Sequence, residues 1–172
     1  NTSIGASALY GGDQGSYNVA AGCEALHWNR GSSNVASGYQ AMYNNDLGFY
    51  NVATGYQAIF NNSDGDYNLA TGYKAMYANT TGNYNTAIGT DALSFNTTGS
   101  INTAIGYNAD VIFPSLINAT VIGSNATVAT SNTMAFGDAT VDRWGFGIST
   151  TNASHALEVG FNNTNGNGAY LT

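Results

Sequence analysis

Short apolar stretches of four or five residues alternate along this chain with polar segments rich in Asn, Thr and Gly. An amphipathic helix requires apolar positions spaced by three, four and seven residues over several turns, and these stretches are too short for that. In segment 52–54, Val52 and Thr54 alternate with Ala53, which predicts a short strand with the alanine on the opposite face. Segment 57–60, Gln-Ala-Ile-Phe, predicts a second short strand in the same unit.

A glycine follows the apolar stretches at a nearly constant interval. From Gly5 to Gly123 the successive gaps are 17, 16, 17, 17, 17, 17 and 17 residues, and the gap to Gly137 is 14. The units share the motif N-x-A-x-G-x-x-A-[LIM], and such a fixed period indicates a repeat architecture. We therefore predict an all-β chain that forms a parallel β-solenoid of about eight 17-residue coils. The interior repeat glycines are Gly22, Gly38, Gly55, Gly72, Gly89, Gly106 and Gly123.

Stacked coils place equivalent residues about 4.8 Å apart, so each repeat position becomes a column along the solenoid. The motif asparagine is expected to form a hydrogen-bonded ladder between coils. The alternative is that each asparagine only satisfies its own turn. The ladder residues would be Asn18, Asn34, Asn51, Asn68, Asn85 and Asn102.

Aromatic residues recur at three further positions of the repeat. Those directly after the repeat glycine are candidate binding residues, because aromatic faces stack on sugars, although packing explains them equally well. These are Tyr39, Tyr56, Tyr73 and Tyr107. The second group precedes the motif asparagine and consists of Tyr17, Tyr50, Tyr67 and Tyr84. The third, aligned to within a residue and a candidate for subunit contacts, consists of Tyr10, Trp28, Tyr43, Phe60, Tyr77 and Phe95.

Composition and charge narrow the classes of partner that the chain is expected to bind. Only 8% of residues are charged, against roughly 25% in typical soluble domains. The net charge is −7 and only three residues are basic, which disfavours a nucleic-acid partner. No apolar run approaches the roughly 20 residues of a membrane-spanning helix, so no membrane insertion is expected. Cys23 is the single cysteine, which excludes a disulfide within the chain.

Catalytic and metal-binding patterns are weak. His27 and His155 lie far apart, without a cysteine or second histidine at ligand spacing. Asp64 and Asp66 form the one tight acid pair, in a turn segment where capping is the simpler role. We therefore predict no enzyme activity, no catalytic residues, no metal site and no cofactor.

The small core of each coil predicts that the chain associates with further copies of itself. Each coil supplies mostly Ala, Val and Ile, a slim core for which oligomerisation is the common remedy, so we expect a homotrimer or stacked filament neighbours.

The repeat loosens around Pro114, and its last unit ends at Gly137. The predicted domains are a β-solenoid over residues 1–140 and a capping or connector segment over 141–172.

Two resemblances extend this interpretation. The units Asn85-Thr-Ala-Ile-Gly89 and Asn102-Thr-Ala-Ile-Gly106 resemble the head repeats of trimeric autotransporter adhesins, although the family's coil is usually shorter. That resemblance implies a left-handed parallel β-roll in which three chains pack together. The segments 143–159 and 166–172 look like the stretch preceding intramolecular chaperone domains of the endosialidase type, which follow phage fibres. This implies an extracellular, cell-surface or virion location.

These observations predict a structural and adhesive protein. A homotrimeric rod would present repeated polar and aromatic surfaces to glycans or host-cell receptors, with avidity from three identical chains. The alternative is a filament subunit that stacks end to end and has no specific ligand. An ice-binding surface would require a flat column of threonines, but threonine alternates with valine and leucine here. A glycan-cleaving enzyme would require paired carboxylates beyond Asp64 and Asp66.

Overall fold

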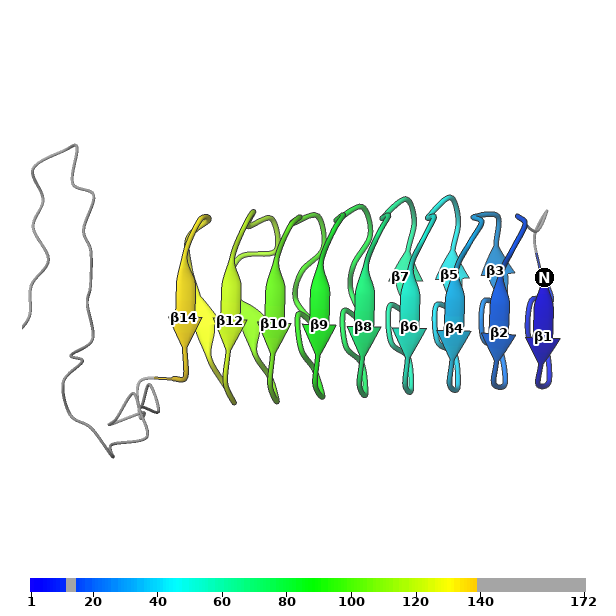
Figure 1. Cartoon of the computed structure of the whole chain (residues 1–172), viewed down its shortest axis with the longest axis horizontal. Coiled ribbons are helices and arrows are strands. Elements are labelled where there is room, and N and C mark those ends of the chain that lie inside the picture. Colours follow the sequence, from blue (N-terminus) through cyan, green and yellow to red (C-terminus); the bar gives the residue numbers. More distant parts are fainter. Residues whose placement is uncertain (12–14, 139–172) are drawn as a thin grey trace, which may run out of the picture. The chain divides into compact units, whose positions relative to one another are not determined.

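The computed structural model describes residues 1–11 and 15–138, all within one compact unit, Asn1–Val141. The predicted 141–172 segment lies outside the described residues. The described residues form strands and turns without a helix, and their strands stack side by side in sequence order from β1 to β14 (Figure 1). The prediction of an all-β, parallel solenoid of about eight coils is therefore confirmed.

One long parallel sheet runs along the solenoid. It contains nine strands in the order β1-β2-β4-β6-β8-β9-β10-β12-β14. Each strand has three residues and pairs with the same repeat position in the adjacent coils, as Ala53 does with Ala36 and Ala70. The strands are β1 Thr2–Ile4, β2 Val19–Ala21, β4 Val35–Ser37, β6 Val52–Thr54, β8 Leu69–Thr71, β9 Thr86–Ile88, β10 Thr103–Ile105, β12 Thr120–Ile122 and β14 Met134–Phe136.

Two shorter parallel sheets form a second side of the coils. The first contains β3 Trp28–Asn29, β5 Asn44–Asn45 and β7 Asn61–Asn62. The second contains β11 Asp110–Val111 and β13 Thr127–Val128. The sequence predicted the second strand of one coil at residues 57–60. In the structure the second strand of that coil is β7, which begins immediately after this segment.

The prediction of a strand over 57–60 is wrong for a geometric reason. A strand points consecutive side chains to opposite faces, whereas Ala58 and Ile59 are consecutive and both fully buried. Gln57 and Ile59 have φ of 51° and 48°, so left-handed residues turn the chain and direct both neighbours inward. The large core residues Leu26, Met42, Met76 and Leu93 share this left-handed conformation.

The core is narrow and repetitive. The middle residue of each interior strand of the long sheet is buried, and most of these residues are alanine. Gly55 shows why the repeat glycine is required: its φ is +130°, and an added Cβ would clash with the carbonyl oxygen of Gly72 in the next coil. The coils therefore approach one another too closely for any other residue at this position.

Candidate functional site

The motif asparagines form a continuous buried column, here called the first asparagine column. Oδ1 of Asn34 accepts a hydrogen bond of 2.9 Å from the main-chain N–H of Asn51, one coil later. Nδ2 of Asn51 donates a bond of 2.7 Å to the carbonyl oxygen of Gly65 in its own coil. Each asparagine therefore joins the next coil and also closes its own turn. The column contains Asn18, Asn34, Asn51, Asn68, Asn85 and Asn102, all at most 1% exposed.

A second asparagine column runs beside the first, and sequence analysis missed it. Nδ2 of Asn62 donates to Oδ1 of Asn45 at 2.7 Å and to the carbonyl oxygen of Gly65 at 2.7 Å. That glycine oxygen therefore accepts one amide from each column. The available signal in the sequence was the N-x-x-G that recurs in the turn segments. The second column contains Asn29, Asn45, Asn62, Asn79 and Asn96.

Both asparagine columns are structural rather than ligand-binding. Their amides are buried, and no buried side-chain N or O atom of the described residues is without a hydrogen-bond partner. Buried amides that are fully hydrogen-bonded rigidify a structure, because an unpaired one would cost about 1–3 kcal/mol. A ligand must therefore contact the outer surface of the coils.

The predicted binding tyrosines are partly brought together. Tyr39, Tyr56 and Tyr73 stack with ring centroids 5.3 and 5.1 Å apart, and each is 41–46% exposed; this is the Tyr39 column. Tyr107 is exposed but stands apart, because Thr90 occupies the intervening coil. Desolvation by neighbouring groups, followed by the charge of nearby Glu24, raises the pKa of Tyr39 above its ordinary value.

Polar side chains accompany the Tyr39 column. Gln57 donates to Gln40 at 2.7 Å, and Gln40 donates to Glu24 at 2.6 Å, which forms a ladder beside the rings. The Lys74 ammonium group lies 5.4 Å from the centroid of the Tyr73 ring. The surface therefore combines aromatic faces with amide and charged groups, the combination that contacts sugar rings and hydroxyls.

The other two aromatic groups also stack. Tyr50, Tyr67 and Tyr84 have centroids 4.9 Å apart at both steps. The third group differs from the prediction at two residues: His27 rather than Trp28 stacks between Tyr10 and Tyr43, and within the described residues the stack ends at Tyr77 without Phe95. Trp28 instead begins β3 and contacts the edge of the His27 ring. The third stack contains Tyr10, His27, Tyr43, Phe60 and Tyr77, with successive centroids 5.0–5.4 Å apart.

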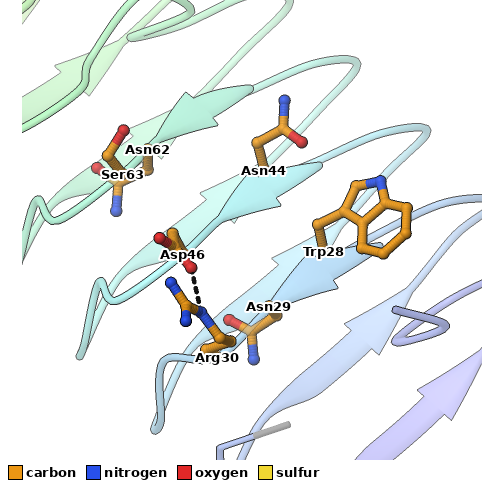
Figure 2. A pocket seen from close by; sticks show the side chains of 7 residues that line it. All are labelled: Trp28, Asn29, Arg30, Asn44, Asp46, Asn62 and Ser63. Carbon is orange, nitrogen blue, oxygen red and sulfur yellow. Dashed lines mark hydrogen bonds and ion pairs between the residues drawn. The ribbon is translucent and has the colours of Figure 1, made fainter. Parts of the chain in front are cut away.

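A surface hollow lies over the three-stranded sheet (Figure 2). Trp28, Asn44 and the Arg30–Asp46 ion pair contribute exposed side chains to its lining. The hydrogen bond from Arg30 holds the pKa of Asp46 below its ordinary value. The hollow has a volume of about 260 Å³, and Asn29, Asn62 and Ser63 complete its lining.

The outer face of the nine-stranded sheet carries no charged residue. Its interior strands expose two columns of side chains, and the larger apolar ones from Val19 to Ile105 are 36–40% exposed. The first outer column contains Val19, Val35, Val52, Leu69, Thr86, Thr103 and Thr120. The second outer column contains Ala21, Ser37, Thr54, Thr71, Ile88, Ile105 and Ile122. Parallel sheets are ordinarily covered on both faces, so this uncovered and uncharged surface favours contact with a partner.

The remaining candidate residues give less support for a functional site. The described residues hold no group of three or more His, Cys, Asp or Glu side chains that could bind a metal. Asp66 accepts a hydrogen bond of 2.7 Å from the main-chain N–H of Phe49, one coil earlier, so it links coils. Cys23 is a free, exposed thiol. Within the described part of the chain, no helix has the length and apolar character needed to span a bilayer.

Comparison of the chain with protein-family profiles, characterised proteins and solved structures finds no match. The geometry of the solenoid and the chemistry of its outer surfaces are therefore the basis for inferring a function.

Proposed function

We propose that this protein is a structural and adhesive segment of an extracellular fibre or surface adhesin. Three copies associate through their solenoids to form a rigid rod, and the rod presents aromatic and polar columns to surface glycans or host-cell receptors. The proposal assigns no catalytic activity and no cofactor. The resemblance of the repeats to trimeric adhesin heads is consistent with this function and with a cell-surface or virion-surface location.

The observation that carries the proposal is the uncharged outer face of the long sheet. The chain has a net charge of −7, so two copies repel each other wherever their acidic side chains meet. The nine strands carry only neutral residues, and this face therefore allows identical copies to approach. Its half-exposed Val, Leu and Ile side chains provide the apolar surface that an interface buries.

The adhesive part of the proposal rests on the Tyr39 column. Three stacked tyrosines at a spacing near 5 Å form an aromatic strip on a rigid support. Rings that are already ordered by stacking lose little conformational entropy when a ligand binds. Three copies of the strip in one rod would multiply weak contacts by avidity.

A filament subunit with no specific ligand is the second candidate. The strand order favours it, because β1 and β14 are the end strands of the nine-stranded sheet within the described residues, and the end strands are where one sheet pairs with another. In that case the solenoids would join end to end rather than side by side.

Sedimentation equilibrium and negative-stain imaging of the full chain separate these possibilities. The proposal expects trimers of limited length, whereas the filament alternative expects fibres that lengthen with concentration. A monomer at micromolar concentration would overturn the proposed assembly. A glycan array probed with the assembled protein tests adhesion, and binding that is lost in Tyr56→Ala but retained in Tyr84→Ala would support the Tyr39 column.

A further inference from the structure

One coil of the solenoid is shorter than its neighbours. The gap from Gly22 to Gly38 is 16 residues, whereas the gaps on either side are 17. The missing residue lies in the turn after β3: Asn29 is separated from Gly31 by one residue, but Asn45 is separated from Gly48 by two. The hydrogen bond from the asparagine amide to the glycine oxygen is kept, at 2.9 Å in both turns.

Arg30 compensates for the missing residue in the main-chain pairing. In the longer coil that follows, the N–H groups of Asp46 and Leu47 each donate to a carbonyl oxygen of the next turn. In the shorter coil, the single N–H of Arg30 bonds the carbonyl oxygens of both Asn45 and Asp46, at 3.2 and 3.0 Å. One residue thus occupies the place of two, and the coil retains its stacking.

The shortened turn coincides with the hollow described above. Its lining comes from this turn and the two coils that follow, where the side chains of Arg30 and Asp46 face each other (Figure 2). Trp28 pairs in register with Asn44, so the indole ring stands where the next coils carry only small amide side chains. The hollow therefore has an aromatic residue at one end and a charged pair at the other.

The preceding coil holds the indole ring of Trp28 in place. Its six-membered ring lies against the backbone of Gly11 in the preceding coil, and a Cβ at Gly11 would overlap it. The ring also makes an edge contact with His27, with centroids 5.1 Å apart at 80°. Trp28 nevertheless remains 51% exposed, so it is an ordered aromatic surface open to solvent.

We infer that this hollow is a binding subsite for one neutral hexose or N-acetylhexosamine unit of a glycan. The apolar C–H face of a pyranose stacks on indole, while paired hydroxyls match the planar donors and acceptors of an amide, a guanidinium and a carboxylate. The volume of about 260 Å³ lies below the roughly 300–1,000 Å³ of pockets for drug-sized ligands, and it suits a single ring rather than a chain.

The charge of the hollow selects a neutral sugar. Arg30 is already paired with Asp46, so the guanidinium offers hydrogen bonds to hydroxyls without an excess positive charge. A sialic or uronic acid would also meet the net charge of −7 of the chain. This inference rests on the adhesive part of the proposed function, since it names one place where a glycan unit binds.

Saturation-transfer NMR on the full chain tests the subsite, with the methyl glycosides of glucose, galactose, mannose and N-acetylglucosamine as probes. At least one glycoside is expected to receive magnetisation from the wild-type protein. Trp28→Ala should reduce that transfer at least tenfold. Phe95→Ala removes an exposed aromatic ring outside the hollow and should leave the transfer unchanged.

An insertion tests the shortened turn directly. A threonine inserted between residues 30 and 31 restores the 17-residue spacing and the N-x-x-G turn of the following coils. This variant should keep the circular dichroism spectrum and thermal midpoint of the wild type but lose transfer to the glycoside. Retained transfer in both the insertion variant and Trp28→Ala, or no transfer to any of the four glycosides, would overturn the subsite.

The glycan array separates this outcome from failure of the proposed function. Array binding that survives in Trp28→Ala but is lost in Tyr56→Ala would refute the subsite and leave adhesion standing. An array with no binding by the wild-type assembly would refute adhesion itself.

Discussion

The main-chain N–H of Asn51 donates a 2.9 Å hydrogen bond to Oδ1 of Asn34, one coil earlier, and both asparagines are fully buried. The same bond recurs from Asn34 to Asn18 and from Asn68 to Asn51. The asparagine side chain therefore supplies a hydrogen bond between coils, as main-chain groups do where strands pair. This explains why the motif asparagine has the same strict period as the repeat glycine.

Replacing Asn51 with alanine is expected to destabilise the solenoid by about 2–4 kcal/mol. The substitution removes the acceptor of the Asn68 N–H and one donor to Gly65, and a buried unpaired donor costs about 1–3 kcal/mol by itself. Chemical denaturation measures the loss. Asn44→Ala is the control, because Asn44 is exposed and the hydrogen bond that its side-chain amide donates is long, at 3.3 Å. The expected change in the free energy of unfolding is under about 0.5 kcal/mol. Equal losses in the two variants would contradict the role of the buried column.

Gly55→Ala is expected to be more damaging than any single asparagine substitution. The φ of +130° is strained for alanine, and the new methyl group would overlap the carbonyl oxygen of Gly72. The coils would have to separate locally, so we expect a loss of about 4 kcal/mol or more, comparable to the largest single-residue effects. Thermal unfolding followed by circular dichroism measures it. Thr54→Ala, on the exposed face of the same strand, should change stability little, and a Gly55→Ala protein as stable as that control would refute the close approach of the coils.

The repeat glycine and the alternation around Ala53 were sufficient to predict the fold from the sequence. Steric demands act at single positions and leave a visible period: only glycine fits at Gly55, and the buried middle position of the interior strands, as at Ala53, is alanine in most coils. The turn over 57–60 was not predictable in the same way, because Ala58 and Ile59 have ordinary apolar side chains and their inward direction depends on left-handed φ values. Sequence patterns do not report those angles for non-glycine residues.

The surface was harder to predict than the core. His27 lies five residues after Gly22, as Tyr43 lies five residues after Gly38, so the distance from the repeat glycine places His27 in the stack, whereas Trp28 is one residue further on and pairs with Asn44. The hollow lies at the shortened turn after β3, and the sign of that turn in the sequence is the 16-residue gap in the glycine period. The neutral outer face of the long sheet does not fix how many copies associate, so the homotrimer stays a prediction.

The outer face of the long sheet predicts how copies wind about each other. The apolar side chains lie in the first outer column from Val19 to Leu69 and move to the second from Ile88 to Ile122. After Leu69, threonine replaces the apolar residues in the first outer column. Threonine has nearly the same shape as valine but carries a hydroxyl group. The terminal strands depart from this scheme, with Ile4 in the second column and Met134 and Phe136 in both. The apolar stripe of the interior strands is thus inclined to the solenoid axis, so the proposed rod is expected to contain copies that cross at a small angle.

Cysteine cross-linking checks this geometry in a Cys23→Ser background. Facing sheets lie about 10 Å apart, so a short bismaleimide is the suitable reagent. Val52→Cys and Ile105→Cys should cross-link several-fold more efficiently than their same-strand controls, Thr54→Cys and Thr103→Cys. Copies that lie straight beside each other would instead cross-link Val52→Cys and Thr103→Cys alike. An absence of cross-links at all four positions would place the interface elsewhere.

Asp110 gives the solenoid a pH dependence of unusual sign. Its side chain is only 4% exposed, and burial raises its pKa although Ser94, Phe95 and Val111 donate hydrogen bonds to it. A carboxyl group with a higher pKa in the folded state than its ordinary value of about 3.9 binds its proton more tightly when folded. Its stabilising contribution is therefore complete below about pH 4 and is lost as the pH rises through the folded-state pKa.

Asp110→Asn is accordingly expected to remove this loss. The free energy of unfolding of the wild type, minus that of the variant, should decrease between pH 3 and pH 7, because the other acids contribute equally to both proteins. Urea denaturation at several pH values measures the difference. Asp46→Asn should show a smaller change of opposite sign, since the hydrogen bond from Arg30 lowers the pKa of Asp46, and the contribution of that exposed pair disappears as the pH falls. Parallel pH profiles for the wild type and Asp110→Asn would show that burial does not perturb this carboxyl group.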